Sequence, residues 1–245
     1  MPEKYLRLSE RLLAVVGFIE KGSCVADIGT DHGYLPVYLA QNGLARRIIA
    51  SDISAGSLRA ALKAAEKYSV VDKISFVVAP GLTGISETEI DTVVISGLGG
   101  ETISQILAES PRIKQDGFRL ILQPQTKIDR LCSWLRDNGY VIQDAKLARD
   151  SGRFYVILLV GATAADESGI RNAGCEITDL PTPEIELFSI LMKKNDPLFV
   201  DYIDNIISRM RRIEDSKAAA GRKSGELKEE RGKLEELEMY KLQYI

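Results

Sequence analysis

The sequence predicts an α/β fold: a mostly parallel, doubly wound sheet of seven strands that ends in an antiparallel hairpin, with a C-terminal helical hairpin after it. Three observations support this prediction. Short apolar runs alternate with helical patterns from residue 25 to residue 135. Two β-rich segments then follow each other directly, separated only by Asp150-Ser151-Gly152, as a β-hairpin requires. Beyond residue 198 the apolar residues change to heptad spacing.

Each element has a local justification. The N-terminal segment Leu8–Ile19 has its apolar residues on one helical face, with Ser9 placed to cap its start. Five strands are expected over Val25–Gly29, Arg47–Ile53, Ile74–Ala79, Thr92–Leu98 and Arg119–Leu122. The helices between and after them are expected over Tyr34–Asn42, over Leu58–Tyr68, from Glu101 onward and around Leu131–Leu135. The closing hairpin is expected to pair Tyr140–Arg149 with Arg153–Val160.

The remaining chain predicts a connection and a helical appendage, which gives three parts: 1–161, 162–197 and 198–245. Within the middle part, Ala162–Asp179 is polar, contains two glycines and shows no periodicity, and Pro181 and Pro183 follow it, so we interpret this part as a linker or loop. The last part carries a heptad seam, made of Phe199, Ile203, Ile206, Met210 and Ile213. Gly221 and Gly225 can break the helix after this seam, which favours an antiparallel, coiled-coil-like hairpin. The alternative is one long helix that dimerises.

Composition excludes several classes of function. The chain has 245 residues, of which 45% are hydrophobic and 27% charged, and a net charge of -3 gives no global signature of nucleic-acid binding. A single histidine and three widely spaced cysteines argue against a metal site and suit a reducing cytoplasm. No apolar run is long enough to span a bilayer, and the N-terminus lacks the apolar core of a signal peptide. We therefore expect a cytoplasmic protein without a metal or a membrane partner.

The stretch VADIGTDHGYLPVYL, residues 25–39, predicts a strand, a glycine turn and a helix start, which together form a nucleotide-like binding site. Asp52, 25 residues after Asp27, ends the second strand and can accept both hydroxyls of a ribose. Asp27 and Asp31 would repel the pyrophosphate of a dinucleotide, whereas they suit the cationic ammonium and sulfonium of S-adenosylmethionine. The terminal antiparallel hairpin points to the same cofactor, because class I methyltransferase sheets end in this way.

Three blocks make the resemblance closer than a fold class. VADIGTDHGYLPVYL, VVISGLGGETI and LILQPQ resemble the bacterial tRNA (adenine-N1)-methyltransferases that modify adenine 22 of tRNA, and the similarity covers about residues 5–160. It implies a Rossmann-like class I methyltransferase fold with a helical C-terminal extension. It also implies methyl transfer from S-adenosylmethionine to N1 of an adenine in tRNA.

The resemblance also implies roles for individual residues. Residues expected to bind the cofactor are Asp27, Gly29, Thr30, Asp31, His32, Gly33, Asp52, Ile53, Gly81, Leu82 and Ser96. Residues expected where the target base meets the methyl group are Asp31, Gly97, Gly99, Gly100 and Glu101, flanked by Gln123, Pro124 and Gln125. His32 is as readily structural as functional. One departure stands out: similar sequences have Gly-Asp-Gly-Leu after the third strand, but this chain has Ala79-Pro80-Gly81-Leu82, so an acid expected to meet the cofactor's adenine is missing.

Binding of tRNA requires a local source of positive charge. The stretch Arg209–Lys223 carries six basic and two acidic side chains. We expect Arg209, Arg211, Arg212 and Lys217 to contact tRNA phosphates. The alternative is that the two helices neutralise each other through ion pairs. Two other functions stay open on the residues alone: a small-molecule methyltransferase whose hairpin mediates dimerisation, and a non-catalytic RNA-binding module. We expect a monomer or a weak dimer.

Overall fold

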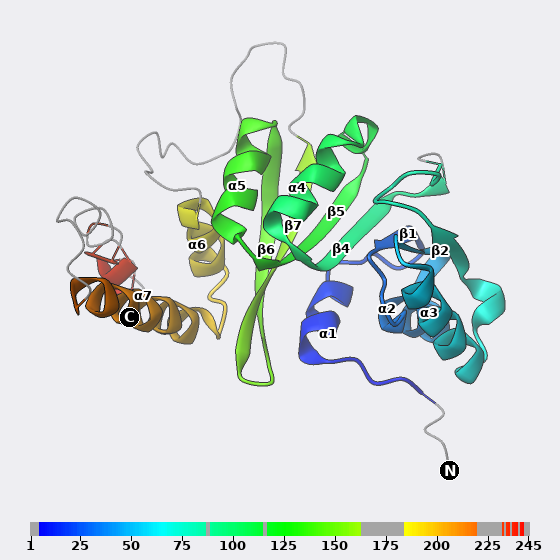
Figure 1. Ribbon diagram of the computed structural model, residues 1–245, viewed down its shortest axis with the longest axis horizontal. Helices are drawn as coiled ribbons and strands as arrows, with labels where there is room; N and C mark the ends of the chain where they lie inside the picture. Colours follow the sequence, from blue (N-terminus) through cyan, green and yellow to red (C-terminus); the bar gives the residue numbers. More distant parts are fainter. Residues whose placement is uncertain are drawn as a thin grey trace. The chain divides into compact units, whose positions relative to one another are not determined.

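The computed structural model describes residues 5–86, 89–114, 117–162 and 184–219, together with residues 232, 234–235, 237–239 and 241–242 near the C-terminus (Figure 1). The chain divides into two compact units, Met1–Ile190 and Leu191–Ile245, and each is described by itself. The boundary between them falls within one helix, so it differs from the three predicted parts. Those predicted boundaries stay a prediction.

The first unit is built on a seven-stranded sheet with the strand order β3-β2-β1-β4-β5-β7-β6. The strands are β1 (Ser23–Ile28), β2 (Ala45–Asp52), β3 (Ser75–Val78), β4 (Thr92–Gly99), β5 (Arg119–Thr126), β6 (Tyr140–Asp150) and β7 (Arg153–Ala162). Neighbours among the first five strands pair in parallel, whereas β7 pairs antiparallel with both β5 and β6. The predicted fold class is therefore confirmed: a doubly wound parallel sheet that ends in an antiparallel hairpin.

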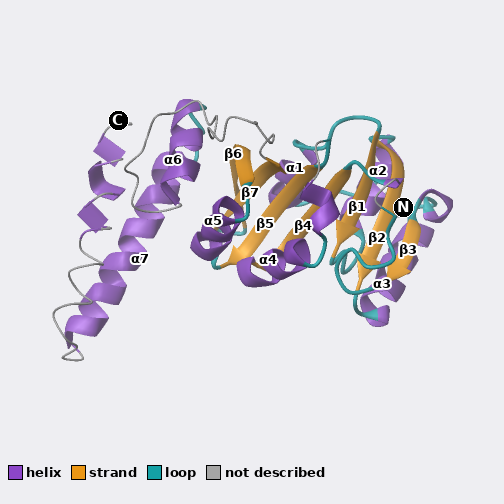
Figure 2. Ribbon diagram, turned by 90° about the horizontal axis from the view of Figure 1, so that it is seen from above, coloured by secondary structure: helices purple, strands orange, loops and turns teal. Residues whose placement is uncertain are grey.

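Helices cover both faces of this sheet. The helices of the chain are α1 (Glu10–Val16), α2 (Tyr34–Asn42), α3 (Ala55–Lys67), α4 (Gly100–Ala108), α5 (Ile128–Asp137), α6 (Glu184–Lys193) and α7 (Phe199–Ala219). Figure 2 shows α1 on one face of the sheet and the α4–α5 pair on the other. The predicted cap is present, because the Ser9 side chain accepts a hydrogen bond from the Leu12 N–H.

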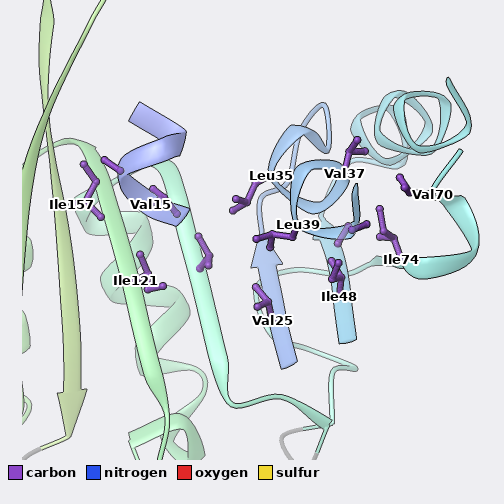
Figure 3. Close-up of a cluster of buried hydrophobic side chains, with 14 of the residues drawn as sticks. Val15, Val25, Leu35, Val37, Leu39, Ile48, Val70, Ile74, Ile121 and Ile157 are labelled. Atoms are coloured by element: carbon purple, nitrogen blue, oxygen red, sulfur yellow. The ribbon is translucent and has the colours of Figure 1, made fainter. Parts of the chain in front are cut away.

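A cluster of buried side chains joins the helices of the first face to the sheet. Val15 of α1 packs near Ile121 and Ile157, while Leu35 and Leu39 of α2 lie over β1 (Figure 3). These residues are at most 3% exposed. Burying such side chains contributes about 1.5–3 kcal/mol each, so this cluster holds the ends of β1 and β2 in fixed positions.

Three predicted boundaries differ from the structure. The first helix is shorter than Leu8–Ile19 and ends at its C-cap Gly17. Strand β5 continues past Leu122, because shifts in its register with β4 accommodate Pro124, which cannot donate to a regular ladder. Helix α6 lies inside the segment predicted as a linker, and its Leu187 and Phe188 are buried.

The second unit contains α7 and helical residues close to the C-terminus. The predicted heptad seam is partly wrong. Phe199 and Ile203 are fully buried, but Ile207 rather than Ile206 continues the seam, and Ile213 is 44% exposed. The observed spacing of four and four follows a straight helical face rather than a heptad. A coiled coil therefore stays a prediction.

Two ion pairs connect α7 to the C-terminal helical residues. Arg211 Nη2 lies 2.5 Å from Glu238 Oε1, and Lys241 Nζ lies 2.7 Å from Asp204 Oδ1. A continuous helix would separate residues 211 and 238 by about 40 Å, because each residue adds about 1.5 Å. The alternative of one long helix is therefore wrong, and the pairing of an early residue of α7 with a late C-terminal one favours an antiparallel hairpin. The predicted breakpoints Gly221 and Gly225 lie outside the described residues.

Candidate active site

A cleft of about 680 Å³ lies in the first unit, at the carboxyl ends of the parallel strands. Strand β1 pairs with β2 along one edge and with β4 along the other, so the strand order reverses between β1 and β4. Ligands of doubly wound sheets bind at such a reversal. The cleft is lined by the turn after β1, the ends of β2 and β4, the loop after β3, and residues of α1 and α4.

The turn after β1 is held in an unusual backbone conformation. Gly29, Asp31 and Gly33 have φ angles of 74°, 51° and 68°, in the left-handed region that glycine adopts most readily. A Cβ atom at Gly33 would lie 2.7 Å from the Cβ of Ala61, so α3 packs directly against the turn. Gly33 therefore shapes the site from behind, since it is not among the residues that line the cleft.

Asp27 is the most strongly perturbed acid of the cleft. It is 5% exposed, and burial raises the pKa of its carboxyl group to about 6. The Thr30 side chain and the Arg11 guanidinium oppose this shift, whereas Asp52 adds to it. The Thr30 hydroxyl is buried and meets no partner at ordinary hydrogen-bond geometry, so its contact with Asp27 is weak. A cationic ligand would stabilise the ionised form of Asp27.

Asp52 joins the end of β2 to the turn after β1. Its carboxylate accepts hydrogen bonds from the Asp31 N–H at 3.1 Å and from the Ser54 N–H at 2.8 Å. The N-cap of α3 is Ser54, which accepts from the Ser57 N–H. Asp52 is therefore not the N-cap of α3, and it lines the cleft, where a ligand can reach it. The neighbouring Ile53 also lines the cleft and is 74% exposed.

Arg11 of α1 is a cleft residue that sequence reasoning missed. Its Nη1 donates hydrogen bonds to Ser96 Oγ at 2.9 Å and to Gln123 Oε1 at 2.7 Å. Its guanidinium also lies 5.7 Å from the centre of the Tyr155 ring. Nothing in the local pattern of an amphipathic helix marks this arginine, because its partners are 85 and 112 residues away in the sequence.

His32 and Tyr34 form an exposed rim of the cleft. Their rings are stacked, with centroids 5.5 Å apart. His32 Nε2 lies 3.5 Å from Asp31 Oδ2, and both side chains are more than half exposed. The histidine therefore lines the cleft without being buried in the structure, which leaves it accessible to a ligand.

The residues predicted at the reacting centre divide into two groups. Gly97, with a φ of 87°, lies at a register shift of β4 and lines the cleft together with Asp31, Ser96 and Gln125. The others are absent from the lining: Gly99, Gly100, Glu101, Gln123 and Pro124. A Cβ at Gly100 would lie 2.4 Å from the Lys127 carbonyl oxygen, so this glycine permits close packing of α4. Gln123 is fully buried beneath the cleft and positions Arg11.

The far wall of the cleft is formed by α4, and this was also missed. Thr102, Gln105, Ile106 and Glu109 line it. Next to them, Ala79, Pro80 and Gly81 line the cleft, whereas the predicted Leu82 is buried and absent from its lining. Helix α4 was expected only to carry glycines at its start, because its mid-helix residues follow no motif.

Within the described residues, no helix is long and apolar enough to cross a membrane. The same part of the chain contains no group of three or more His, Cys, Asp or Glu side chains that could hold a metal ion. The polar side chains that line the cleft are carboxylates, amides, hydroxyls, an imidazole and a guanidinium.

Known proteins with similar sequences and structures agree with this geometry. Residues 8–158 match the family described as "Methyltransferase domain". The tRNA (adenine(22)-N(1))-methyltransferase of Bacillus subtilis is 36% identical over 169 residues, which cover 69% of this chain and 68% of that protein. The crystal structure of the B. subtilis m1A22 tRNA methyltransferase has a TM-score of 0.77 and 28% identity, and the match covers 98% of this chain and 99% of that one.

A third relative carries a ligand. The Streptococcus pneumoniae putative tRNA (m1A22) methyltransferase, solved in complex with S-adenosyl-L-methionine, has a TM-score of 0.76 and 28% identity. That match covers 94% of this chain and 99% of the other. The chain therefore belongs to the methyltransferase-domain family, among the tRNA (adenine(22)-N(1))-methyltransferases that these relatives represent.

Proposed function

We propose that this protein transfers a methyl group from S-adenosylmethionine to N1 of an adenine in tRNA, at position 22. The observation that carries the proposal is the cleft at the strand-order reversal, with buried Asp27 beside the glycine turn and Asp52 on the next strand. This arrangement occurs in a chain whose relatives have that activity by name. We place the activity in the cytoplasm, in a monomer or a weak dimer.

The residues of the cleft fit the proposed cofactor. The ionised Asp27 carboxylate suits the ammonium group in the methionine part of the cofactor. Burial disfavours the ionised form of Asp27 and raises its pKa, so a bound ammonium group would stabilise the carboxylate. Asp52 lies one strand away and has carboxylate oxygens for a ribose. The exposed Ile53 next to it offers apolar surface to a purine ring.

The chemistry requires alignment more than acid–base catalysis. Bound S-adenosylmethionine supplies a sulfonium methyl group, which the N1 lone pair of a neutral adenine attacks while the sulfur leaves as a neutral thioether. Positive charge thus moves onto the base. The cleft contributes by holding the base in line, and Asp31, exposed at the rim, stabilises the developing cation.

Arg11 has a positioning role in this proposal. Its two hydrogen bonds tie α1 to β4 through Ser96 and to β5 through Gln123, next to the place where Ser96 and Gly97 line the cleft. The buried Gln123 accepts from Arg11 through Oε1 and donates through Nε2 to the Pro124 carbonyl at 2.9 Å, so both ends of its amide are engaged. This network fixes the wall against which the target base would lie.

The basic stretch of α7 is the proposed tRNA contact, with one reassignment. Arg211 is engaged by Glu238, as the ion-pair alternative expected for that residue. Arg209 and Arg212 are exposed on α7, and these two remain the candidates that the described residues support. The side chain of Lys217 lies outside the described residues. We expect Arg209→Glu to weaken tRNA binding several-fold and to reduce its salt dependence by about one phosphate contact.

The matched control for this change is Lys63→Glu, which reverses an exposed charge on α3 of the first unit. Binding is measured by fluorescence anisotropy with labelled tRNA at several salt concentrations. Equal losses for the two variants would show a non-specific charge effect and contradict a contact at Arg209.

The activity itself is tested with a tRNA transcript, which carries no modifications. The wild-type protein, the transcript and methyl-labelled S-adenosylmethionine are incubated, and the digested nucleosides are separated. We expect labelled 1-methyladenosine with the wild type and none with Asp27→Asn. Cofactor binding without any methylated nucleoside would overturn the proposal and favour a binding module.

A further inference from the structure

The polar face of α4 has no role in the function proposed above. Thr102, Gln105, Ile106 and Glu109 line the cleft, and their spacing of three, one and three residues places them on one face of the helix. Gln105 and Glu109 are exposed, so they present their polar groups to whatever fills this end of the cleft.

The loop after β3 lies against this face of α4. A Cβ atom at Gly81 would come within 3.2 Å of Ile106 Cγ2. The lining residues of the loop, Ala79, Pro80 and Gly81, have no polar side chain. The Ala79 N–H already donates to the Asp52 carbonyl, and the Pro80 carbonyl accepts from the Thr83 N–H. The loop therefore supplies shape, apolar contact and some backbone groups, but no polar side chain that could accept from a base.

The order of the strands puts this loop beside the end of β2. With a ribose at Asp52, the attached base would lie near Ile53, the next residue, whose side chain is exposed. The next strand in the sheet is β3, since Asp52 pairs with Val78 directly before the loop. A purine that extended in this direction would meet the apolar surface of Ile53, Pro80 and Ile106, and its polar edge would come within reach of Gln105 and Glu109, which line the same cleft.

Gln105 of α4 and Glu109 at its C-cap are arranged to accept hydrogen bonds from that edge. Gln105 Nε2 donates to Glu109 Oε1 at 3.0 Å. This bond orients both side chains and leaves the amide oxygen of Gln105 and the second carboxylate oxygen of Glu109 as acceptors. The exocyclic amino group of adenine has two N–H donors, which match these two oxygens.

We propose that Gln105 and Glu109 recognise the exocyclic amino group of the cofactor's adenine. The inference rests on the proposed function, because it requires a cofactor that contains adenine. It also accounts for the departure at Ala79-Pro80-Gly81-Leu82: the acceptor expected from that loop is supplied by the neighbouring helix instead.

The test compares two ligands that differ only at this amino group. Calorimetry of the full chain with S-adenosylhomocysteine and with its purine analogue, which carries a hydrogen atom at C6 in place of the amino group, measures the preference for adenine. Because the purine analogue has no donor at C6 and leaves both acceptors unpaired, we expect the wild type to prefer S-adenosylhomocysteine by about tenfold. Glu109→Ala and Gln105→Ala should each reduce this preference to within about threefold of unity.

The matched control is Glu66→Ala, which removes an exposed glutamate of α3 outside the cleft and should keep the full preference. Both α4 positions are exposed, so circular dichroism should show folded variants. If the α4 variants bind S-adenosylhomocysteine with the wild-type preference, this inference is wrong and the proposed function stands. If the wild type binds neither ligand, the inference and the proposed function both fail.

Discussion

The two ends of the cleft differ in burial more than in composition. At one end Asp27 is 5% exposed and lies beside Arg11, whose hydrogen bonds reach Ser96 and Gln123. At the other end Glu109 is exposed, and Ile53 is 74% exposed. Charges interact strongly when water is excluded and weakly when it is present. The comparison indicates that the buried end sets cofactor affinity and its pH dependence, while the exposed end sets the choice of base.

The largest expected effect is at the buried carboxylate. Asp27→Asn keeps the shape of the side chain but removes the charge that faces the cofactor's ammonium group. Losing one partner of a desolvated charge pair typically costs about 2–5 kcal/mol, so we expect at least about thirtyfold weaker binding of S-adenosylhomocysteine by calorimetry. A loss of less than about fivefold would show that burial does not distinguish Asp27 from the exposed acids.

The pH dependence of binding tests the same carboxylate without a mutation. Because the pKa of Asp27 is raised to about 6, the free protein holds a proton there below that pH, and a cationic ligand has to displace it. Affinity for S-adenosylhomocysteine should rise about fivefold between pH 5 and pH 6, as the ionised fraction of Asp27 grows from about a tenth to about a half, and level off above about pH 7. The Asp27→Asn variant should lack this rise, whereas Glu109→Ala should retain it.

The stability of the free protein should change in the opposite sense. The carboxyl group binds its proton more tightly when folded than in its ordinary state, with a pKa of about 6 against 3.8. The stability that this protonation adds is present below pH 3.8 and is lost as the pH rises through about 6, by about 3 kcal/mol at most. In urea unfolding, the free energy of unfolding of the Asp27→Asn variant should therefore increase relative to that of the wild type as the pH rises over this range. A constant difference would mean that Asp27 is not buried in solution.

The next effect concerns the turn that supports the buried end. Gly33 and Gly43 both have positive φ angles, but only Gly33 has a neighbour within 4 Å of an added Cβ, the Cβ of Ala61 at 2.7 Å. We expect Gly43→Ala to cost about 1 kcal/mol of unfolding free energy through backbone strain alone. Gly33→Ala should cost about 2 kcal/mol more, because α3 has to move. Equal losses in urea denaturation would show that the contact with α3 is not tight.

The smallest expected effect is at Arg11, which acts on Asp27 from the side. Its guanidinium lowers the pKa of Asp27, so Arg11→Gln should move the midpoint of the pH-dependent binding above 6. The shift distinguishes an electrostatic role from mere packing, which would lower affinity equally at every pH. A purely structural role would leave the midpoint unchanged in the same calorimetric series.

The sequence predicted those parts of the site that lie within one continuous stretch. The residues of the turn after β1 can be recognised as one motif, because the glycines with positive φ and the acid at the strand end are neighbours in the chain. The strands were predictable for a similar reason, since apolar runs and hairpin turns are local signals. Of the cofactor residues expected, only Gly33 and Leu82 do not line the cleft, and both lie directly behind it.

The cleft residues that the sequence did not predict are brought there by packing between segments that are distant in the chain. Arg11 and Glu109 reach the cleft from helices whose local patterns are ordinary, and only the fold brings them to the carboxyl ends of the strands. The role of Gly100 at the reacting centre stays a prediction, and the structure adds that α4 packs closely against the Lys127 backbone at this glycine. Helix α6 was missed because the linker predicted from the polar segment before it was continued to residue 197, past the apolar Leu187 and Phe188.

The central claim is methyl transfer to N1 of adenine 22, and mapping the modified nucleotide tests it most directly. A transcript with adenine at position 22 and a matched transcript with guanine there are each incubated with the protein and S-adenosylmethionine, then copied by reverse transcriptase. Methylation of N1 blocks the pairing edge of adenine, so we predict a stop next to position 22 in the first transcript and none in the second. A stop at another position, or equal copying of both transcripts, would contradict the claim.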